Sequence, residues 1–165
     1  MSDSIMTFSA SGGGASGTTY ALPSKKIGLC HGVFDVLHFG HVAHLVAARK
    51  ICDELIVVVT PKQYVNKGHG RPIFDDNERC RVLSALKCVD RVYVGEYGRE
   101  GVAIRALQRY LPSIYIKGHE YADLKHEGFK AEVEYCRANG IQVVFTCEPT
   151  FSSTETIKRL QAVKL

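Results

Sequence analysis

The sequence lacks the signatures of several common protein classes. No C-x-x-C pair occurs, and no apolar run approaches the roughly eighteen residues that a membrane span needs. No basic segment followed by an apolar stretch opens the chain, so we expect no signal peptide. There is no G-x-S-x-G, no Walker A pattern, no H-E-x-x-H and no G-x-G-x-x-G between a strand and a helix. The fingerprints of common hydrolases, P-loop kinases, zinc proteases and dehydrogenases are therefore missing.

The composition is that of an ordinary globular chain with a mild positive charge. The 165 residues are 45% hydrophobic and 23% charged, which suits one domain with a hydrophobic core. A net charge of +4 is too small to indicate nucleic-acid binding, but it suits a protein that handles anionic small molecules. We expect neither nucleic acid nor a membrane as a partner.

The six cysteines lie in apolar runs and form no recognisable metal or disulfide pattern. They are Cys30, Cys52, Cys80, Cys88, Cys136 and Cys147. Buried, reduced thiols are the expected state, which favours a cytoplasmic location.

The chain divides into a polar tail and one domain. Residues 1–24 are rich in Ser, Gly and Thr, and they hold too few branched apolar residues to offset the entropy of ordering, so they predict a disordered tail. Residues 25–165 alternate short β-rich runs with helical patterns. We expect strands at 26–32, 54–60, 90–94, 113–118 and 141–146. We expect helices at about 41–51, 75–88, 99–110, 127–139 and 153–163.

This alternation predicts an α/β fold with a single doubly wound, five-stranded parallel sheet. In such sheets ligands bind beyond the carboxyl ends of the strands. The residues that follow Gly32, Thr60, Lys117 and Thr146 are therefore the first candidates for a site.

The first strand–helix junction, HGVFDVLHFGH, carries two histidines three residues apart. His38 and His41 flank Gly40 beside a predicted helix N-terminus, which attracts anions and leaves room for a phosphate chain. Imidazole N–H groups can stabilise charge at a phosphorus centre. Zinc bound by His38, His41 and His44 is the alternative, although no carboxylate or cysteine completes an obvious ligand set. His31 and His44 are expected to pack rather than react.

Cationic and hydroxyl side chains follow the other strand ends. Lys67 and Arg71 lie in the loop NKGHGRP, where mobile cations would neutralise a triphosphate. Arg79 follows an Asp75–Glu78 capping box and is a candidate to face the site. After the fourth strand, Gly118 turns the chain, so Lys117 and Gly118 could cradle a base or ribose.

The last predicted helix opens with SST. Ser152 and Glu155 have capping-box spacing, and the hydroxyls of Ser153 and Thr154 with the free N–H groups of the helix could hold a phosphate.

Together, GVFDVLHFGH and SST resemble the cytidylyltransferase-like branch of the nucleotidyltransferase superfamily. The closest resemblance is to the adenylyltransferase domain of bacterial heptose-phosphate enzymes, and it extends from residue 26 to about residue 160. It implies a Rossmann-like fold and a reaction in which a phosphorylated acceptor attacks the α-phosphorus of a nucleoside triphosphate, releasing pyrophosphate. It also implies Mg²⁺ bound with the triphosphate, and a homodimer.

The resemblance implies roles for particular residues. The catalytic residues it implies are His38, His41 and Lys67. The nucleotide-binding residues are Gly32, Val33, Phe34, Gly40, His41, Arg79, Lys117, Gly118, Ser153 and Thr154. The substrate-binding residues are Asp35, Arg71, His119 and Glu120.

The expected substrates are ATP and a sugar 1-phosphate of the heptose type. Where the heptose enzymes have KGGDY, this chain has KGHEY, so His119 and Glu120 differ at the base and sugar position. The alternative is CTP with a polyol phosphate or phosphonate. A nucleotide-binding regulatory module without turnover is a further hypothesis. Since the heptose enzymes also contain a kinase domain, a separate kinase is expected to supply the phosphorylated acceptor.

Overall fold

Strands and helices alternate along the described chain, as the sequence predicts. The structure is a computed structural model that describes residues 25–123, 127–148 and 152–162, so the predicted tail at 1–24 lies outside the described residues. The strands are β1 (Ile27–Gly32), β2 (Glu54–Val59), β3 (Arg91–Val94), β4 (Ile114–Gly118) and β5 (Gln142–Thr146). The helices are α1 (Phe39–Arg49), α2 (Asp76–Ser84), α3 (Val102–Tyr110), α4 (Glu127–Ala138) and α5 (Ser153–Ala162). Two 3₁₀ turns, η1 (Lys62–Tyr64) and η2 (His119–Tyr121), follow β2 and β4.

The five strands form one parallel sheet, which confirms the predicted fold class. Their order is β3-β2-β1-β4-β5, and every neighbouring pair is parallel. The chain reverses its direction of travel across the sheet between β1 and β4. In doubly wound sheets this switch point is where ligands bind.

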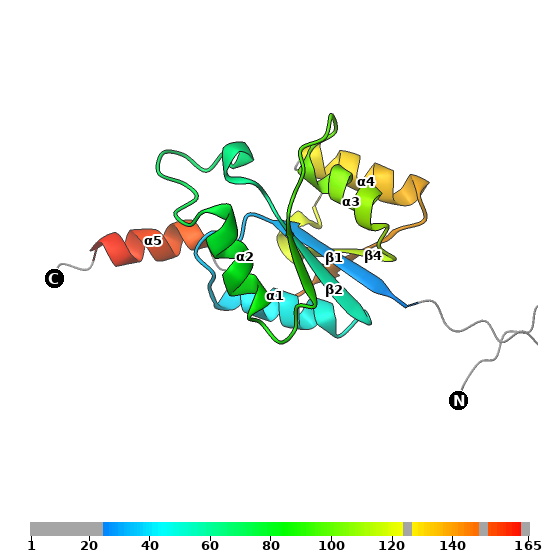
Figure 1. Cartoon of the computed structure of the whole chain (residues 1–165), viewed down its shortest axis with the longest axis horizontal. Helices are drawn as coiled ribbons and strands as arrows, with labels where there is room; N and C mark the ends of the chain where they lie inside the picture. The colour runs from blue at the N-terminus through cyan, green and yellow to red at the C-terminus, as the bar shows by residue number, and fades with distance from the viewer. Residues whose placement is uncertain (1–24, 124–126, 149–151, 163–165) are drawn as a thin grey trace, which may run out of the picture.

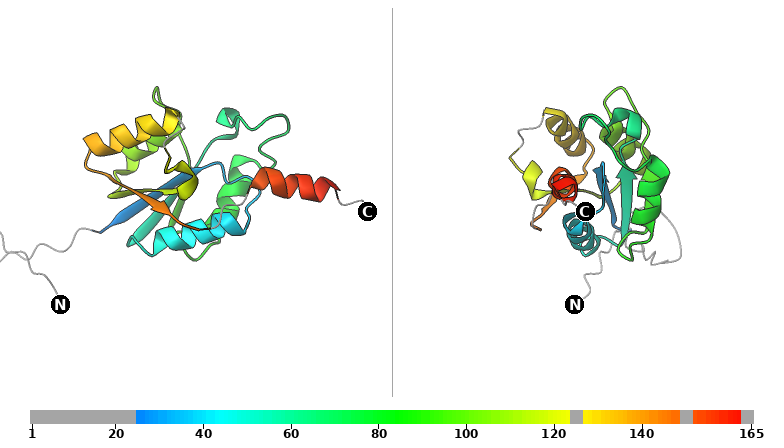
Figure 2. Two further views of the ribbon diagram at one scale, coloured as in Figure 1. Left: turned by 180° about the vertical axis from the view of Figure 1, so that it is seen from behind. Right: turned by 90° about the vertical axis from the view of Figure 1, so that its left-hand side faces the viewer.

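Helices cover both faces of the sheet (Figures 1 and 2). Leu55, Val57 and Val59 of β2 pack in the cluster that includes Leu45 of α1. The alternate residues Ile56 and Val58 pack in the other cluster, with side chains of α3 and α4. All six residues of β2 are buried, because a central strand covered on both faces has no polar side. No helix in the described ranges combines the length and apolarity required to cross a bilayer.

The structure corrects several sequence expectations. Helix α3 begins at Val102 rather than near residue 99, because Gly101 adopts a φ of 97° that ends any helix upstream. Helix α2 ends at Ser84, and tight turns lead from there into β3. All six cysteines are free thiols, as expected. Only three of them are buried, namely Cys30, Cys52 and Cys136, whereas Cys80 and Cys88 are partly exposed and Cys147 is exposed.

Gly28 gives a test of how tightly β1 is packed. A Cβ at this position would lie 2.8 Å from Cys52 Sγ and 2.9 Å from Ile116 Cδ1. Gly28→Ala should therefore lower the free energy of unfolding by about 1–3 kcal/mol, the usual cost of overpacking. Gly128→Ala is the control, because its Cβ would meet nothing within 4 Å. Urea denaturation of both variants measures the difference, and equal stabilities would contradict this account.

Candidate functional site

A pocket of about 460 Å³ lies at the carboxyl ends of β1, β4 and β5. Its wall also includes residues of α1, α4 and the N-terminus of α5, so it extends across the top of the sheet at the switch point. Most of the predicted site residues line it: Gly32, Val33, Phe34, His38, Gly40, His41, Lys67, Lys117, Gly118, Glu120 and Ser153. The ends of β1, β4 and β5, three of the four strand ends selected from the sequence, thus meet at one cavity. Thr60, which follows β2, also lines it, so all four are represented.

The histidine pair is built into the start of α1. His38 is the N-cap residue, and its Nδ1 accepts a hydrogen bond from the backbone N–H of His41 at 3.4 Å. A neutral ring that accepts at Nδ1 carries its proton on Nε2. The two rings stack with centroids 3.8 Å apart and planes 17° apart, and Phe34 packs edge-on against His41 at 5.3 Å. These contacts set both rings on one wall of the pocket.

His41 is held in its neutral form. Burial is the main cause that lowers its pKa to about 3, and the nearby His38 and Lys67 lower it further. Its Nδ1 is buried and has no hydrogen-bond partner among the described residues. Burial lowers the pKa of His38 as well. At neutral pH the pair therefore offers two uncharged rings, each with one N–H donor.

His31 and His44 each form a hydrogen bond with a threonine, and both line the pocket. His44 Nδ1 lies 2.7 Å from Thr146 Oγ1 and joins α1 to β5, whereas His31 Nε2 lies 3.0 Å from Thr60 Oγ1. Within the described ranges no three His, Cys, Asp or Glu side chains are grouped as a metal site would require. The zinc alternative is therefore not supported.

Lys117 occupies a buried aromatic cage on the opposite side of the sheet from the histidine pair. Its Nζ lies 4.1 Å from the ring centroid of Tyr121, and the rings of Tyr115 and Phe129 lie 5.6 and 5.7 Å away. Burial lowers the pKa of Lys117, while the carboxylate of Glu132 acts in the opposite direction. The sequence identified Lys117 but not its cage: Tyr115 and Tyr121 lie within four residues of it, and only Phe129 comes from another element, α4.

The KGHEY segment divides between the pocket and the surface. Glu120 lines the pocket, and its carboxylate occupies the space beside Gly118. His119 is exposed and does not line the pocket, so the structure does not bring it to the predicted substrate position.

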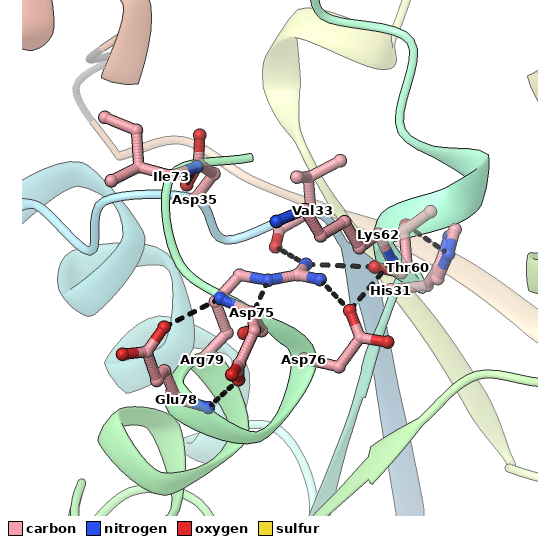
Figure 3. Close-up of polar contacts among 10 residues, drawn as sticks. All are labelled: His31, Val33, Asp35, Thr60, Lys62, Ile73, Asp75, Asp76, Glu78 and Arg79. Atoms are coloured by element: carbon pink, nitrogen blue, oxygen red, sulfur yellow. Dashed lines mark hydrogen bonds and ion pairs between the residues drawn. The ribbon is translucent and has the colours of Figure 1, made fainter. Parts of the chain in front are cut away.

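The expectation that Arg79 faces the pocket is wrong. Its side chain does not line the pocket, and its guanidinium is fully buried. Its Nη1 donates to the backbone carbonyls of Val33 at 2.6 Å and Thr60 at 2.9 Å, and its Nη2 donates to the Asp76 carboxylate at 2.5 Å (Figure 3). The Asp75–Glu78 capping box forms as predicted and fixes the start of this helix. Arg79 is therefore a structural residue that joins α2 to the chain just beyond β1 and β2.

Asp35, Arg71 and Thr154 lie beside the pocket rather than in its wall. The Asp35 carboxylate is completely buried and accepts a hydrogen bond from Arg71 Nε at 2.5 Å. Arg71 Nη1 donates to Thr154 Oγ1 at 3.3 Å. At the start of α5 the backbone N–H of Glu155 donates to Ser152 Oγ at 3.4 Å, so one half of the expected capping box is present.

Four further residues line the pocket without having been named as site residues: Thr146, Phe129, Glu132 and Glu148. The strand end at Thr146 was selected from the sequence, and Thr146 and Glu148 lie at that end. The residues of α4 carried no such signal, since they reach the pocket only through the packing of that helix on the sheet.

Comparison with known proteins agrees with this geometry. The cytidylyltransferase-like family matches residues 29–159. The chain is 37% identical over 139 residues to the Bifunctional protein HldE of Rhodopseudomonas palustris strain BisB18, and 38% identical over 142 residues to that of Actinobacillus pleuropneumoniae serotype 5b strain L20. These alignments cover 82% and 85% of this chain but only 27% and 29% of the relatives, so the chain spans little more than a quarter of their length.

Solved structures show the same fold. The lipopolysaccharide core biosynthesis protein of Thermoplasma volcanium superposes with a TM-score of 0.64 at 28% identity, covering 77% of this chain and all of that one. Pantothenate synthetase of Thermus thermophilus has a TM-score of 0.54 at 20% identity and covers 82% of this chain and 59% of that one. The second similarity concerns the fold alone.

Replacing Arg79 should destabilise the fold. Arg79→Lys leaves buried carbonyls without donors, at a cost of about 1–3 kcal/mol for each unpaired group. Arg81→Lys, at an exposed position of the same helix, is the matched control and should change stability by less than about 0.5 kcal/mol. Urea denaturation compares the two, and an Arg79→Lys variant as stable as the parent would refute the structural role.

The buried histidines should make the protein sensitive to acid. Burial lowers the pKa of both His31 and His41 to about 3 from the ordinary 6.5, so between these values the unfolded chain binds protons that the folded chain does not. The contribution of these two histidines to the free energy of unfolding is therefore fully present above pH 6.5 and is lost as the pH drops toward 3. The two groups contribute a slope of roughly 2–3 kcal/mol per pH unit near pH 5.

Substitution separates the contribution of one histidine. His41→Asn should lower that slope by about half, because one titrating group is lost. His69→Asn, at an exposed loop position, should leave it unchanged. Denaturant unfolding at several pH values between 4.5 and 7 measures the slopes, and identical slopes for parent and His41→Asn would contradict the assignment.

Proposed function

We propose that this chain, which belongs to the cytidylyltransferase-like family and is a nucleotidyltransferase, joins the nucleoside monophosphate of ATP to a sugar 1-phosphate of the heptose type. The observation that carries this proposal is the stacked pair His38 and His41 at the N-terminus of α1, in the wall of the pocket. The identity with the HldE proteins supports a phosphorylated sugar as the acceptor.

The reaction needs positioning and charge stabilisation more than a protein nucleophile. A phosphate oxygen of the acceptor forms a bond to the α-phosphorus, the bond from that phosphorus to the bridging oxygen breaks, and pyrophosphate leaves with the electron pair. The acceptor phosphate is already ionised near neutral pH, so no strong base is required. The protein contributes by holding both reactants in line and by stabilising the charge that develops between them.

The histidines suit this role because they are neutral donors. In the proposed complex, N–H groups of His38 and His41 donate to oxygens of the α-phosphate as negative charge accumulates there. Their lowered pKa values keep both rings uncharged at neutral pH, and a neutral imidazole retains one N–H group to donate. Lys67 at the pocket mouth, together with the α5 N-terminus at Ser153, would neutralise the leaving pyrophosphate.

Lys117 and its aromatic neighbours form the part of the pocket proposed for the nucleoside. Tyr121 and Phe129 present apolar surface, and Glu120 and Glu132 present hydrogen-bond acceptors. An adenine amino group would find an acceptor there, and so would that of cytosine. CTP with a polyol phosphate or phosphonate is therefore the alternative that the experiment must distinguish.

We propose that Mg²⁺ enters with the triphosphate. Within the described ranges no cluster of three carboxylate, histidine or cysteine ligands forms a dedicated cage. This arrangement fits Mg²⁺, which retains waters and binds mainly to substrate phosphates in such sites. The ion would neutralise phosphate charge when bound. We also propose that a separate kinase supplies the acceptor phosphate and that the chain acts as a homodimer.

Pyrophosphate release tests the proposal. The purified chain, with Mg²⁺ and each of ATP, CTP, GTP and UTP, is assayed against heptose and hexose 1-phosphates, glycerol phosphate and simple phosphonates. Release with ATP and a sugar 1-phosphate is expected, whereas release with CTP alone would favour the alternative. Thermal stabilisation by a nucleotide without release under any condition would favour a binding module without turnover.

Replacing His41 should abolish most of the activity. His41→Ala should lower turnover by about 100-fold or more, since it removes a donor to the transition state. His69→Ala, in the exposed loop, should leave turnover within about twofold. Circular dichroism confirms that both variants fold, and a folded His41→Ala variant with normal turnover would overturn the proposed role.

A further inference from the structure

Asp35 is a buried carboxylate that joins two loops next to the pocket. It lies between β1 and α1 with no exposed surface. One carboxylate oxygen accepts from Arg71 Nε at 2.5 Å and the other from the backbone N–H of Ile73 at 2.8 Å. Figure 3 shows Ile73 beside Asp35. A buried carboxylate is costly unless it is paired and hydrogen-bonded, so these contacts depend on one another.

The backbone around Asp35 is strained. Phe34 has a φ of 50° and Val36 a φ of 53°. Both values lie in the left-handed region, which residues other than glycine rarely adopt. Such conformations cost about 1–3 kcal/mol each and are retained only where surrounding contacts enforce them. The two hydrogen bonds of Asp35 are the contacts at the centre of this strained segment. The hydrogen bonds from Arg71 and Ile73, which belong to a second loop, therefore help to hold this strained segment in place.

The second loop, residues 66–73, needs such an attachment. Gly68 and Gly70 have φ values of 91° and 72° and open space around their Cα atoms, so little local packing restrains them. Arg71 is nearly buried and connects this loop to Asp35 on one side and to Thr154 of α5 on the other. Lys67, four residues before Arg71, lines the pocket.

We propose that Asp35 is a positioning residue that, through Arg71, holds the 66–73 loop closed and places Lys67 at the pocket before any substrate binds. Asp35 does not line the pocket, and the role proposed for it is exerted through the loop. Holding a cation in place beforehand removes an ordering cost from the bound state. The effect on turnover rests on the proposed function, whereas the effect on the loop does not.

Arg71 has one further group that fits this arrangement. Its Nη2 is buried and finds no hydrogen-bond partner within the described ranges. Because Asp35 holds Nε and Thr154 holds Nη1, the guanidinium is fixed with one nitrogen unused.

Trypsin tests the loop directly, without any assumption about activity. It cleaves after Lys67 when the loop opens, whereas proline after Arg71 blocks cleavage there. Asp35→Asn keeps the side-chain size but removes the charge, and should speed cleavage after Lys67 by about tenfold or more in the otherwise folded protein. Asp53→Asn is the control, since this exposed carboxylate also accepts one backbone N–H, that of Lys26.

Cleavage at other lysines and arginines in the same digest reports global unfolding. A selective increase at Lys67 supports the proposal. An Asp35→Asn variant cleaved at Lys67 no faster than the parent, or faster at all sites equally, overturns it. If the parent shows no pyrophosphate release, the proposed function fails while this digest still decides the role of Asp35 in the loop.

Where the parent is active, turnover gives a second test. Asp35→Asn should lower kcat by about tenfold in the parent and have little further effect in a Lys67→Ala background, because both changes act through the same cation. Equal losses in the two backgrounds would show that Asp35 acts elsewhere. A rise in the KM for one substrate with unchanged kcat would instead make it a direct substrate contact, and would also overturn the proposal.

Discussion

The buried guanidinium of Arg79 is the interaction on which the site depends most. Where parallel strands stop, backbone carbonyls lose their ladder partners and must find donors elsewhere. Arg79 supplies them to Val33 and Thr60, just beyond β1 and β2, and Asp76 balances its charge. A flat guanidinium can bond to several acceptors in one plane, which an ammonium cannot do. The edge of the sheet that carries the pocket is thereby fixed to α2.

On that fixed edge the protein places groups that carry little charge of their own. The two stacked histidines are kept neutral by burial, and the cations stand further out at Lys67 or inside the aromatic cage at Lys117. This separation suits phosphoryl transfer, because the substrate phosphates carry the negative charge and the protein stabilises it with oriented hydrogen-bond donors. It also explains why the sequence shows no obvious nucleophile.

The sequence was sufficient to predict the fold and the groups at the strand ends. It was insufficient to predict whether a given polar side chain points into the pocket or into the protein interior. Alternating β-rich and helical runs predicted the parallel sheet, and the ends of its strands predicted most of the pocket wall. Arg79 and Asp35 were assigned to ligands because a polar residue near a site looks the same whether it faces the cavity or the interior. The aromatic cage of Lys117 combines Tyr115 of β4 with rings of η2 and α4, and the packing that brings the three rings together has no local pattern in the sequence.

The pocket draws on residues from His31 near one end of the domain to Ser153 near the other. A ribosome releases these contributions in order, and the wall formed by α5 comes last. Domains generally fold as units during synthesis, so the nascent chain would carry the histidine pair with no complete cavity until α5 had emerged. Assembly of the complete cavity therefore waits until α5 has been synthesised, after all the other elements that line it.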